Sequence, residues 1–368
     1  MAERGAKPVV HPVRARVLKA ISTFTSPLLP DDYLELINPL WSTRELRGRV
    51  EELVPENGGA TTVLIRPGHA WPGHEPGQYL RIGFDIDGKR HWRAYSITSD
   101  PGRDDGFLSI TPKLVEEGVV SPYVNRELRP GAIVSLSDVE GQFVLPDPRP
   151  ERILFISAGS GITPIMAMLR CLDREDKLDD VVHLHSAPTP DDVIFGKRLR
   201  DLTVRNEGLR MHEQHTRTPD GGGRIRPSDL EQLCPDWRER ETFLCGPAEL
   251  IEDFEVRWEE EEITDRLHLE RFQPVIGGGD GPGSGGTIKF TKSDIEATSD
   301  GSQPILVAGE EAGAELPFGC RMGVCHTCIG KLCSGELRDL RSGEVHGDEG
   351  EMVRTCVNAP EGPVEIAL

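Results

Sequence analysis

The sequence predicts three successive domains: an antiparallel β-barrel, an α/β domain built on a parallel sheet, and a smaller cysteine-rich domain at the C-terminus. The chain has 368 residues, more than one hydrophobic core usually organises. Near residue 149, short β-rich runs separated by glycine and proline give way to apolar strands that alternate with helices. A glycine-dominated segment over 276–286 then precedes the last part of the chain. These changes of pattern predict the domain boundaries.

Composition and charge argue against several functions. The formal charge of -20 at pH 7 argues against nucleic-acid binding, because a phosphate backbone requires a basic face. No apolar run approaches the roughly 20 residues that span a bilayer, and the N-terminus lacks the apolar core of a secretory signal. We therefore expect a cytoplasmic protein, in which the eight cysteines are metal ligands or reduced core thiols rather than disulfides.

The first two predicted segments are an extension and the barrel. Residues 1–45 contain helix-favouring fragments and are interpreted as an N-terminal helical extension. Residues 46–148 contain β-rich runs, among them TTVLIRP, GQYLRIGFDI and HWRAYSITS. The short, regular spacing of these runs predicts an antiparallel barrel.

The second half of the chain contains the other two domains. Residues 149–275 alternate apolar strands such as RILFISA, VVHLHSA and ETFLCG with helical segments. Continuous apolar strands with interleaved helices indicate a parallel sheet covered on both faces, an architecture typical of nucleotide-binding domains. The composition of 276–286 predicts a flexible linker, and residues 287–368 form the third domain.

The C-terminal domain carries the most specific motif of the chain. Cys320, Cys325 and Cys328 have the spacing C-x4-C-x2-C, and Cys356 follows as a fourth cysteine. This spacing is typical of a plant-type 2Fe-2S cluster, which needs four thiolates and takes three of them from one loop. Zinc is the alternative, although a structural zinc site usually uses two CxxC-like pairs, and a Rieske cluster would need a second histidine besides His326. The cysteines expected to be packed thiols are Cys171, Cys234 and Cys333.

Three further motifs occur in order along the barrel and the α/β domain. RAYSITS (93–99) lies on a predicted barrel strand. GSGITP (159–164) follows an apolar strand and opens a helix, so its backbone amides would face an anion at the helix N-terminus. Because proline replaces the last glycine of the G-x-G-x-x-G fingerprint, this motif alone is weak evidence. CGP (245–247) ends another strand.

Together with the cysteine cluster, these motifs resemble those of the ferredoxin-NADP reductase superfamily. The resemblance is to members fused to a C-terminal plant-type ferredoxin domain, as in oxygenase and desaturase reductases, and it covers nearly everything from about residue 47 onward. It implies an FAD-binding β-barrel, an NAD(P)-binding α/β domain and a β-grasp ferredoxin domain of the α+β class. The implied cofactors are FAD, a 2Fe-2S cluster, and NADPH or NADH.

The resemblance assigns the flavin site to two segments. The first supplies an aromatic ring that stacks on the flavin, a hydroxyl near its reactive nitrogen and a guanidinium for the pyrophosphate. Its residues are Arg93, Tyr95, Ser96 and Ser99, with catalytic roles implied for Tyr95 and Ser96. The second is a pyrophosphate clamp at a helix start, formed by Gly118, Val119, Val120 and Ser121. The presence of both segments favours FAD over FMN, which stays open as an alternative.

The resemblance likewise assigns the nicotinamide site. The loop and helix start that receive the pyrophosphate are formed by Gly159, Gly161, Thr163 and Pro164. Cys245 is implied to be catalytic beside the reacting nicotinamide carbon, next to Gly246 and Pro247, and Phe272 shields the flavin face. The residues expected near a 2′-phosphate are Ser186, Arg217 and Arg224. These cations slightly favour NADPH, and NADH stays open.

The predicted function is electron transfer from NAD(P)H through FAD and the cluster to an acceptor protein. Hydride transfer requires positioning rather than a dedicated acid or base. The segment LLPDDYLELINPLWS, followed by RGRV, resembles reductases of fatty-acyl desaturases, so we expect a membrane-bound diiron desaturase as partner and a location peripheral to the inner face of the membrane. The alternative is a reductase component of a soluble ring-hydroxylating oxygenase or another monooxygenase. A redox sensor without catalytic turnover is a third interpretation.

Overall fold

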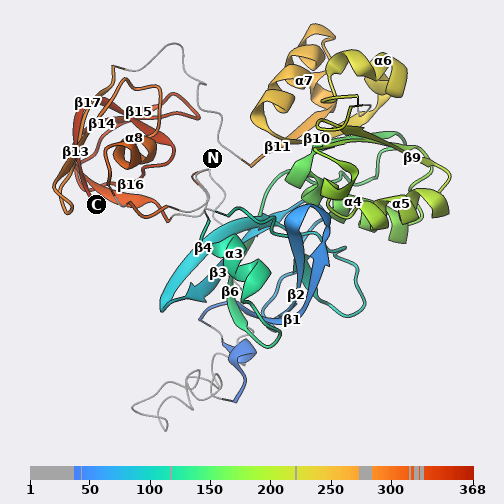
Figure 1. Cartoon of the computed structure of the whole chain (residues 1–368), viewed down its shortest axis with the longest axis horizontal. Coiled ribbons are helices and arrows are strands. Elements are labelled where there is room, and N and C mark those ends of the chain that lie inside the picture. The colour runs from blue at the N-terminus through green and yellow to red at the C-terminus, as the bar shows by residue number, and fades with distance from the viewer. Residues whose placement is uncertain are drawn as a thin grey trace.

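The computed structural model describes residues 37–42, 44–116, 118–219, 222–272, 284–314, 316–318, 323 and 327–368 (Figure 1). The predicted N-terminal helical extension lies almost wholly outside these residues, as does most of the predicted linker. Two of the four predicted cluster ligands, Cys320 and Cys325, are also outside them.

The first sheet is antiparallel and closes into a barrel. Its strands are β1 (Arg47–Glu56), β2 (Ala60–Pro67), β3 (Tyr79–Ile86), β4 (Lys89–Ser96), β5 (Leu108–Ile110) and β6 (Ile133–Glu140). They are ordered β4-β3-β6-β1-β2-β5, and a bridge between Ile97 and Ile110 joins the continuation of β4 to β5. The predicted barrel is therefore confirmed.

Alternation of side chains along the barrel strands creates its core. Val63 and Ile65 on β2, and Leu80 and Ile82 on β3, are fully buried in one apolar cluster. Helix α3 (Val120–Arg126) adds Val120 and Val124 to this cluster. Residues two apart on a strand share a face, which explains this core.

The second sheet is parallel. Its strands are β7 (Ile153–Ala158), β8 (Val181–Ala187), β9 (Leu209–His215), β10 (Glu241–Gly246) and β11 (Leu267–Arg271), in the order β11-β10-β7-β8-β9. Chain order reverses between β7 and β10, and such a switch point is where open α/β sheets bind ligands. The predicted parallel sheet is confirmed.

Helices cover both faces of this parallel sheet. They are α4 (Ile162–Arg174), α5 (Gly196–Arg205), α6 (Leu230–Leu233) and α7 (Ala248–Glu260). Phe155 belongs to the core under α4 and α5, whereas Leu154 belongs to the core under α6 and α7. Figure 1 shows these two helix pairs on opposite sides of the sheet. Burial on both faces explains why strand β8 is apolar or uncharged throughout.

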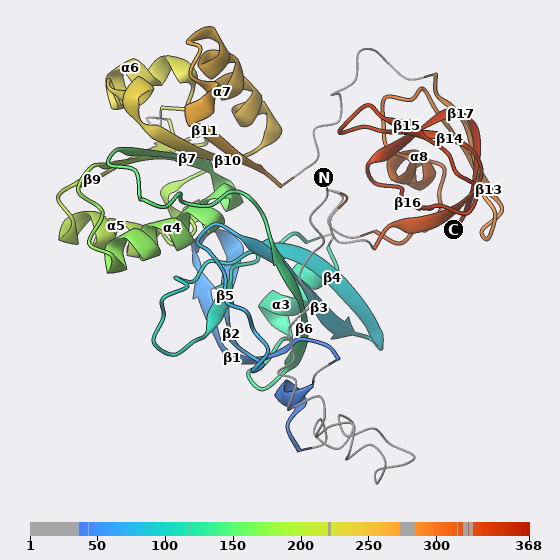
Figure 2. The ribbon, with the colours of Figure 1, turned by 180° about the vertical axis from the view of Figure 1, so that it is seen from behind.

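The third sheet is mixed and belongs to a separate α+β unit (Figure 2). Its strands are β12 (Gly286–Phe290), β13 (Ile295–Ser299), β14 (Ile329–Asp339), β15 (Val345–His346), β16 (Met352–Arg354) and β17 (Asn358–Ala367). Parallel pairing of β12 with β17 combines with antiparallel pairing of β14 with β17. Helix α8 (Ile305–Glu311) packs on the sheet through Ile305 and Leu306. This arrangement confirms the predicted fold class.

Short 3₁₀ helices lie in the connections between these elements. They are η1 (Pro39–Trp41), η2 (Asn57–Gly59), η3 (Gly159–Gly161), η4 (Pro190–Asp192), η5 (Pro227–Asp229), η6 (Trp237–Glu239) and η7 (Thr264–Arg266). In the described part of the chain, no helix has the length and apolar character needed to cross a membrane.

Candidate functional site

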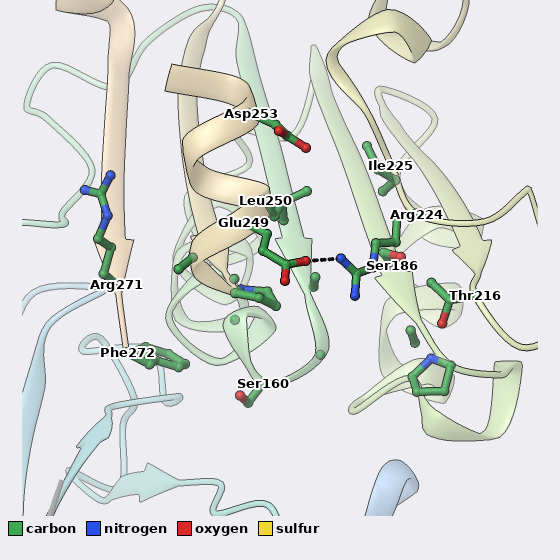
Figure 3. Close-up of a pocket in the computed structure, with 18 of the residues that line it drawn as sticks. Ser160, Ser186, Thr216, Arg224, Ile225, Glu249, Leu250, Asp253, Arg271 and Phe272 are labelled. Carbon is green, nitrogen blue, oxygen red and sulfur yellow. Dashed lines mark hydrogen bonds and ion pairs between the residues drawn. The ribbon is translucent and has the colours of Figure 1, made fainter. Parts of the chain in front are cut away.

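A cavity of about 660 Å³ lies at the carboxyl ends of the parallel strands, at the switch point between β7 and β10 (Figure 3). Its walls come from the turn after β7, the end of β8, the start of α7 and the end of β11. Seven of the predicted cofactor residues line it: Gly159, Gly161, Ser186, Arg224, Gly246, Pro247 and Phe272. The size and position suit a dinucleotide.

The glycine loop after β7 has two glycines with different requirements. Gly159 has φ +54°, and a Cβ at this position would have no atom within 4 Å, so the space beside it is open to a ligand. At Gly161 a Cβ would lie 2.1 Å from the carbonyl oxygen of Cys245. The loop therefore touches the end of β10, and α4 begins directly after it. This geometry suits close approach of a pyrophosphate to backbone amides.

Cys245 is fully buried, and the next residue, Gly246, lines the cavity. It pairs with Ser157 on β7 and with Glu270 on β11 in the parallel register. Burial, and then the charge of Glu270, raise the pKa of the thiol well above its usual value. Cys245 is therefore a neutral thiol at pH 7 rather than a thiolate nucleophile.

Glu270 is a candidate functional residue that the sequence interpretation missed. Burial raises the pKa of this carboxyl to about 8. Its Oε2 atom is buried and has no hydrogen-bond partner within the described residues. A buried, unpaired carboxyl beside Cys245 is typical of a functional site. In the sequence, Glu270 is only an acidic residue two positions before Phe272 at the end of a strand. Such a position is too common to predict a functional role.

The predicted flavin segment lies on β4 and its continuation. Tyr95 is half-buried against the barrel core, and burial raises the pKa of its phenol. Arg93 donates from Nη1 to the carbonyl oxygen of Trp92 at 2.7 Å. Ser99 is fully buried and accepts a 3.0 Å hydrogen bond from the backbone amide of Ser109, inside the closure of the barrel. Its hydroxyl thus already has a partner in the protein.

Ser96 connects the flavin segment to the nucleotide loop. Its hydroxyl oxygen lies 3.4 Å from the hydroxyl oxygen of Thr163 on α4, and the Thr163 hydroxyl donates to the carbonyl oxygen of Ser160 at 2.9 Å. Pro164 is buried in the first turn of the same helix, where its missing amide proton has no cost. The structure therefore brings two motifs that are separated by more than sixty residues into direct contact.

The predicted pyrophosphate clamp spans the start of α3, with Val120 and Ser121 in the first turn of the helix. Val119 is exposed, whereas Val120 is buried in the barrel core. Ser121 accepts a hydrogen bond from the amide of Val115 at 3.0 Å and donates to its carbonyl oxygen at 3.3 Å. Gly118 donates its amide to the same carbonyl at 3.0 Å. These bonds close the loop before the helix.

Arg224 lies at the outer end of the cavity, and Arg271 lies on the opposite side (Figure 3). Arg224 forms an ion pair with Glu249 across the cavity, close to Ser186 and Thr216 (Figure 3). Arg217, in contrast, is not part of the lining, and its amide bonds to the carbonyl oxygen of Pro188. The lining cations missed at the sequence level are Lys113, Arg226 and Arg271. Arg226 could have been predicted, because it lies two positions after Arg224 in the run GRIRP. Lys113 could not, because it belongs to the barrel part of the chain and reaches the cavity only through the tertiary fold.

The described cluster cysteines are both buried. Cys328 precedes β14, and Cys356 lies between β16 and β17. The amide of Gly323 donates to the Cys356 sulfur at 3.2 Å, with φ +73° at this glycine. Arg354 donates to the carbonyl oxygen of Gly323 at 2.8 Å and holds the loop. Amide donors to cysteine sulfur suit a thiolate-bound cluster, so these residues fit the 2Fe-2S centre.

The chain matches three family models and several known proteins. The matching models are the 2Fe-2S iron-sulfur cluster binding domain (288–361), the oxidoreductase NAD-binding domain (155–255) and the oxidoreductase FAD-binding domain (69–144). An NADPH oxidoreductase of Mycobacterium tuberculosis is 44% identical over 96% of this chain and 92% of its own. A glycine betaine monooxygenase reductase subunit of Chromohalobacter salexigens is 27% identical over 79% and 86%.

Solved structures agree with this fold. The structure of phthalate dioxygenase reductase aligns with a TM-score of 0.58 and 20% identity, covering 88% of this chain and 97% of the other. The fold, the cavity and the family models define an NAD(P)H-dependent oxidoreductase with FAD and a 2Fe-2S cluster. The chain belongs to the ferredoxin-NADP reductase superfamily, in the form that carries a C-terminal ferredoxin domain.

Proposed function

We propose that this protein takes electrons from NADPH and delivers them singly, through FAD and the 2Fe-2S cluster, to an oxygen-activating partner protein. The observation that carries the proposal is the contact between Thr163 and Ser96, which joins the nucleotide loop to the flavin strand. When bound, the nicotinamide supplies a hydride, the flavin splits the electron pair, and the cluster carries one electron at a time.

The protein's own residues contribute position and exclusion of water. Gly159 leaves open space for a pyrophosphate at the start of α4, and Gly161 lets the same loop pack against the end of β10. Tyr95 offers a ring for stacking, while Ser96 and the neutral thiol of Cys245 lie at the meeting point of the two domains. Hydride transfer depends chiefly on such orientation. The cluster ligands are proposed to be Cys320, Cys325, Cys328 and Cys356, with the first and second taken from the spacing alone.

NADPH is proposed over NADH because of the outer end of the cavity. Arg224 and Arg226 line this end together with Ser186, and a guanidinium is well suited to a 2′-phosphate. The name of the Mycobacterium tuberculosis relative, an NADPH oxidoreductase, supports the same choice.

An oxygenase is the acceptor that the relatives support best. Relatives 27–29% identical are named as reductase subunits of glycine betaine monooxygenase and of stachydrine N-demethylase, and as one of the subunits of 1,2-phenylacetyl-CoA epoxidase. A membrane-bound diiron desaturase is the second candidate, because the segments 28–42 and 47–50 resemble those of desaturase reductases. None of these relatives is named for a desaturase.

Anaerobic visible spectroscopy of the purified holoprotein tests the electron path. Stepwise NADPH should bleach the flavin bands and the cluster absorbance together, and NADH should do so more slowly. The reduced protein is then mixed with a purified soluble oxygenase or with membranes containing a desaturase. Turnover by one of the two identifies the acceptor class, and a chain that binds both cofactors but is not reduced by either nucleotide would contradict the proposal.

A further inference from the structure

The nucleotide-binding helix α4 lies with one face along the flavin strand and its continuation. Thr163, Arg170 and Arg174 follow each other at spacings of seven and four residues, which places them on one side of the helix. Their partners are Ser96, Thr98 and Asp100, every second residue of the barrel segment. The Thr163 contact is 3.4 Å and the Arg174 contact to Asp100 is 2.6 Å, with the Arg170 contact between them.

Arg170 differs from Arg174 because it is half-buried, whereas Arg174 is exposed. One of its terminal nitrogens, Nη1, donates to the backbone carbonyl oxygen of Thr98. The other, Nη2, is buried and has no hydrogen-bond partner among the described residues. Arg174, in contrast, leaves 43% of its side chain exposed. Burial also lowers the pKa of Arg170 to about 10.

A strained aromatic residue supports the Arg170 guanidinium. The guanidinium carbon lies 5.3 Å from the centre of the Phe195 ring. Phe195 is buried at the start of α5 with φ +63°, a left-handed conformation that bulky residues rarely adopt. Strain of this kind persists only where surrounding structure imposes it, and it concentrates at functional positions.

A half-buried arginine whose buried Nη2 has no acceptor among the described residues is a costly way to join two domains. Apolar residues of similar volume often replace buried charges without loss of stability. The arrangement does, however, fix one atom of α4 against one carbonyl of the barrel, and α4 carries the GSGITP loop at its beginning. Sliding of the helix along the strand would shift the nucleotide relative to the flavin.

We propose that Arg170 is a positioning residue, which locks α4 in register with the Ser96–Asp100 segment and thereby sets the distance between nicotinamide and flavin. The effect of Arg170 on the rate of flavin reduction rests on the proposed function. Its effect on the register of α4 against the Ser96–Asp100 segment does not. Arg170 is not part of the cavity lining, and its bond is to the backbone carbonyl of Thr98.

The test uses the full-length holoprotein with Arg170→Met and the matched control Arg174→Gln. Anaerobic stopped-flow measurements give the rate constant of flavin reduction at saturating NADPH and, from its concentration dependence, the Kd of NADPH. We expect Arg170→Met to lower the saturating rate constant about 10- to 100-fold, as small misplacements of reacting groups do. Kd should change by no more than about threefold, since the binding groups remain. Arg174→Gln should stay within about twofold, because Arg174 is itself 43% exposed and Asp100 keeps the hydrogen bond from the amide of Gly102.

A second readout does not depend on turnover. Hydrogen exchange of the peptide 96–102 should become faster in Arg170→Met than in wild type and in Arg174→Gln. If Arg170→Met does not fold, Arg170→Lys takes its place, since lysine keeps the charge but lacks the planar group that stacks on Phe195. A wild-type rate of flavin reduction in the Arg170 variant, or equal slowing in Arg174→Gln, would overturn the proposal. If NADPH fails to reduce even the wild-type flavin, the proposed function fails, and unchanged exchange of 96–102 would then overturn the role of Arg170.

Discussion

At the residue scale, the fold gives the Glu270 carboxyl a raised pKa that the neighbouring sequence does not predict. It stands next to Cys245 in the sheet register although 25 positions separate the two in the chain. Its carboxyl is buried without a hydrogen-bond partner for Oε2 in the described chain, which is why its pKa rises to about 8. Such a group lowers the stability of the apoprotein, and carboxyls with a raised pKa of this kind cluster at functional sites.

Glu270→Gln should therefore stabilise the apoprotein in a pH-dependent way. The folded-state pKa lies above the usual value of 4.5, so wild-type stability declines as pH rises from 4.5 to about 8. The amide does not titrate, and the gain should be near zero at pH 4.5 and reach roughly 3 kcal/mol at pH 7. Urea unfolding at several pH values measures it. Glu249→Gln, on the exposed side of the cavity, is the control, and an equal gain there would contradict the interpretation.

The ion pair between Arg224 and Glu249 predicts that substitutions of its two partners have opposite effects on the use of NADPH. Loss of a charge-assisted bond to a 2′-phosphate costs about 1.5–3 kcal/mol, so Arg224→Ala should lower kcat/KM for NADPH about 10- to 100-fold. Glu249→Gln removes the competing carboxylate and should lower KM for NADPH. Neither change should affect NADH by more than about twofold, because that nucleotide lacks the phosphate. Steady-state kinetics with both donors decides, and parallel losses with NADH would refute the assignment.

The element scale separates what the sequence could predict from what it could not. The short β-rich runs separated by glycine and proline predicted the barrel, and the continuous apolar runs in β7 and β8 predicted the parallel sheet, because burial on both faces dictates such runs. Closure of the barrel at Ile97 and Ile110 and the strand order of the parallel sheet depend on contacts between distant segments. The docking of α4 on the Ser96–Asp100 segment has no local signature, so the meeting of the two motifs became visible only in three dimensions.

The buried strand β8 contains two histidines, His183 and His185. Both are fully buried and share the hydroxyl of Ser157, at 2.9 Å from His183 Nε2 and 2.7 Å from His185 Nδ1. Burial, and then the nearby His215, lower the pKa of His185 to about 3. The sheet therefore accommodates these rings in their neutral form only.

Acid should weaken the α/β domain through this pair. The folded-state pKa lies below the unfolded value of 6.5, so stability is complete above pH 6.5 and declines as pH falls towards 3. At pH 5, His185 alone should cost about 2 kcal/mol of unfolding free energy. In His185→Asn this loss should shrink, since an amide keeps a hydrogen bond to Ser157 without titrating. Thermal or urea unfolding between pH 5 and 7 compares the two proteins, and identical pH slopes would argue against the histidine.

At the scale of the whole molecule, electron delivery requires the cluster domain to serve two partners in turn. The parallel sheet and the barrel touch through several direct bonds, including Arg174 to Asp100 and Arg198 to Glu56. The ferredoxin-type unit follows a segment, 276–286, whose glycine-rich composition predicts a flexible linker. A flexible chain of this length has a root-mean-square span of about 18 Å. Such a span would let the cluster approach the flavin edge and then present itself to the acceptor.

Changing the linker should alter the two electron-transfer steps unequally. Deleting about half of residues 276–286 restricts reach, so delivery from the cluster to an external acceptor should slow several-fold, while flavin reduction by NADPH, confined to the first two domains, should be unaffected. Replacing the segment with a glycine–serine sequence of equal length is the control and should behave as wild type, because length and flexibility are preserved. Stopped-flow spectra resolve flavin reduction, cluster reduction and acceptor reduction separately. If shortening leaves both cluster reduction and acceptor reduction at wild-type rates, the cluster domain works from one fixed position and the linker merely joins two folded units.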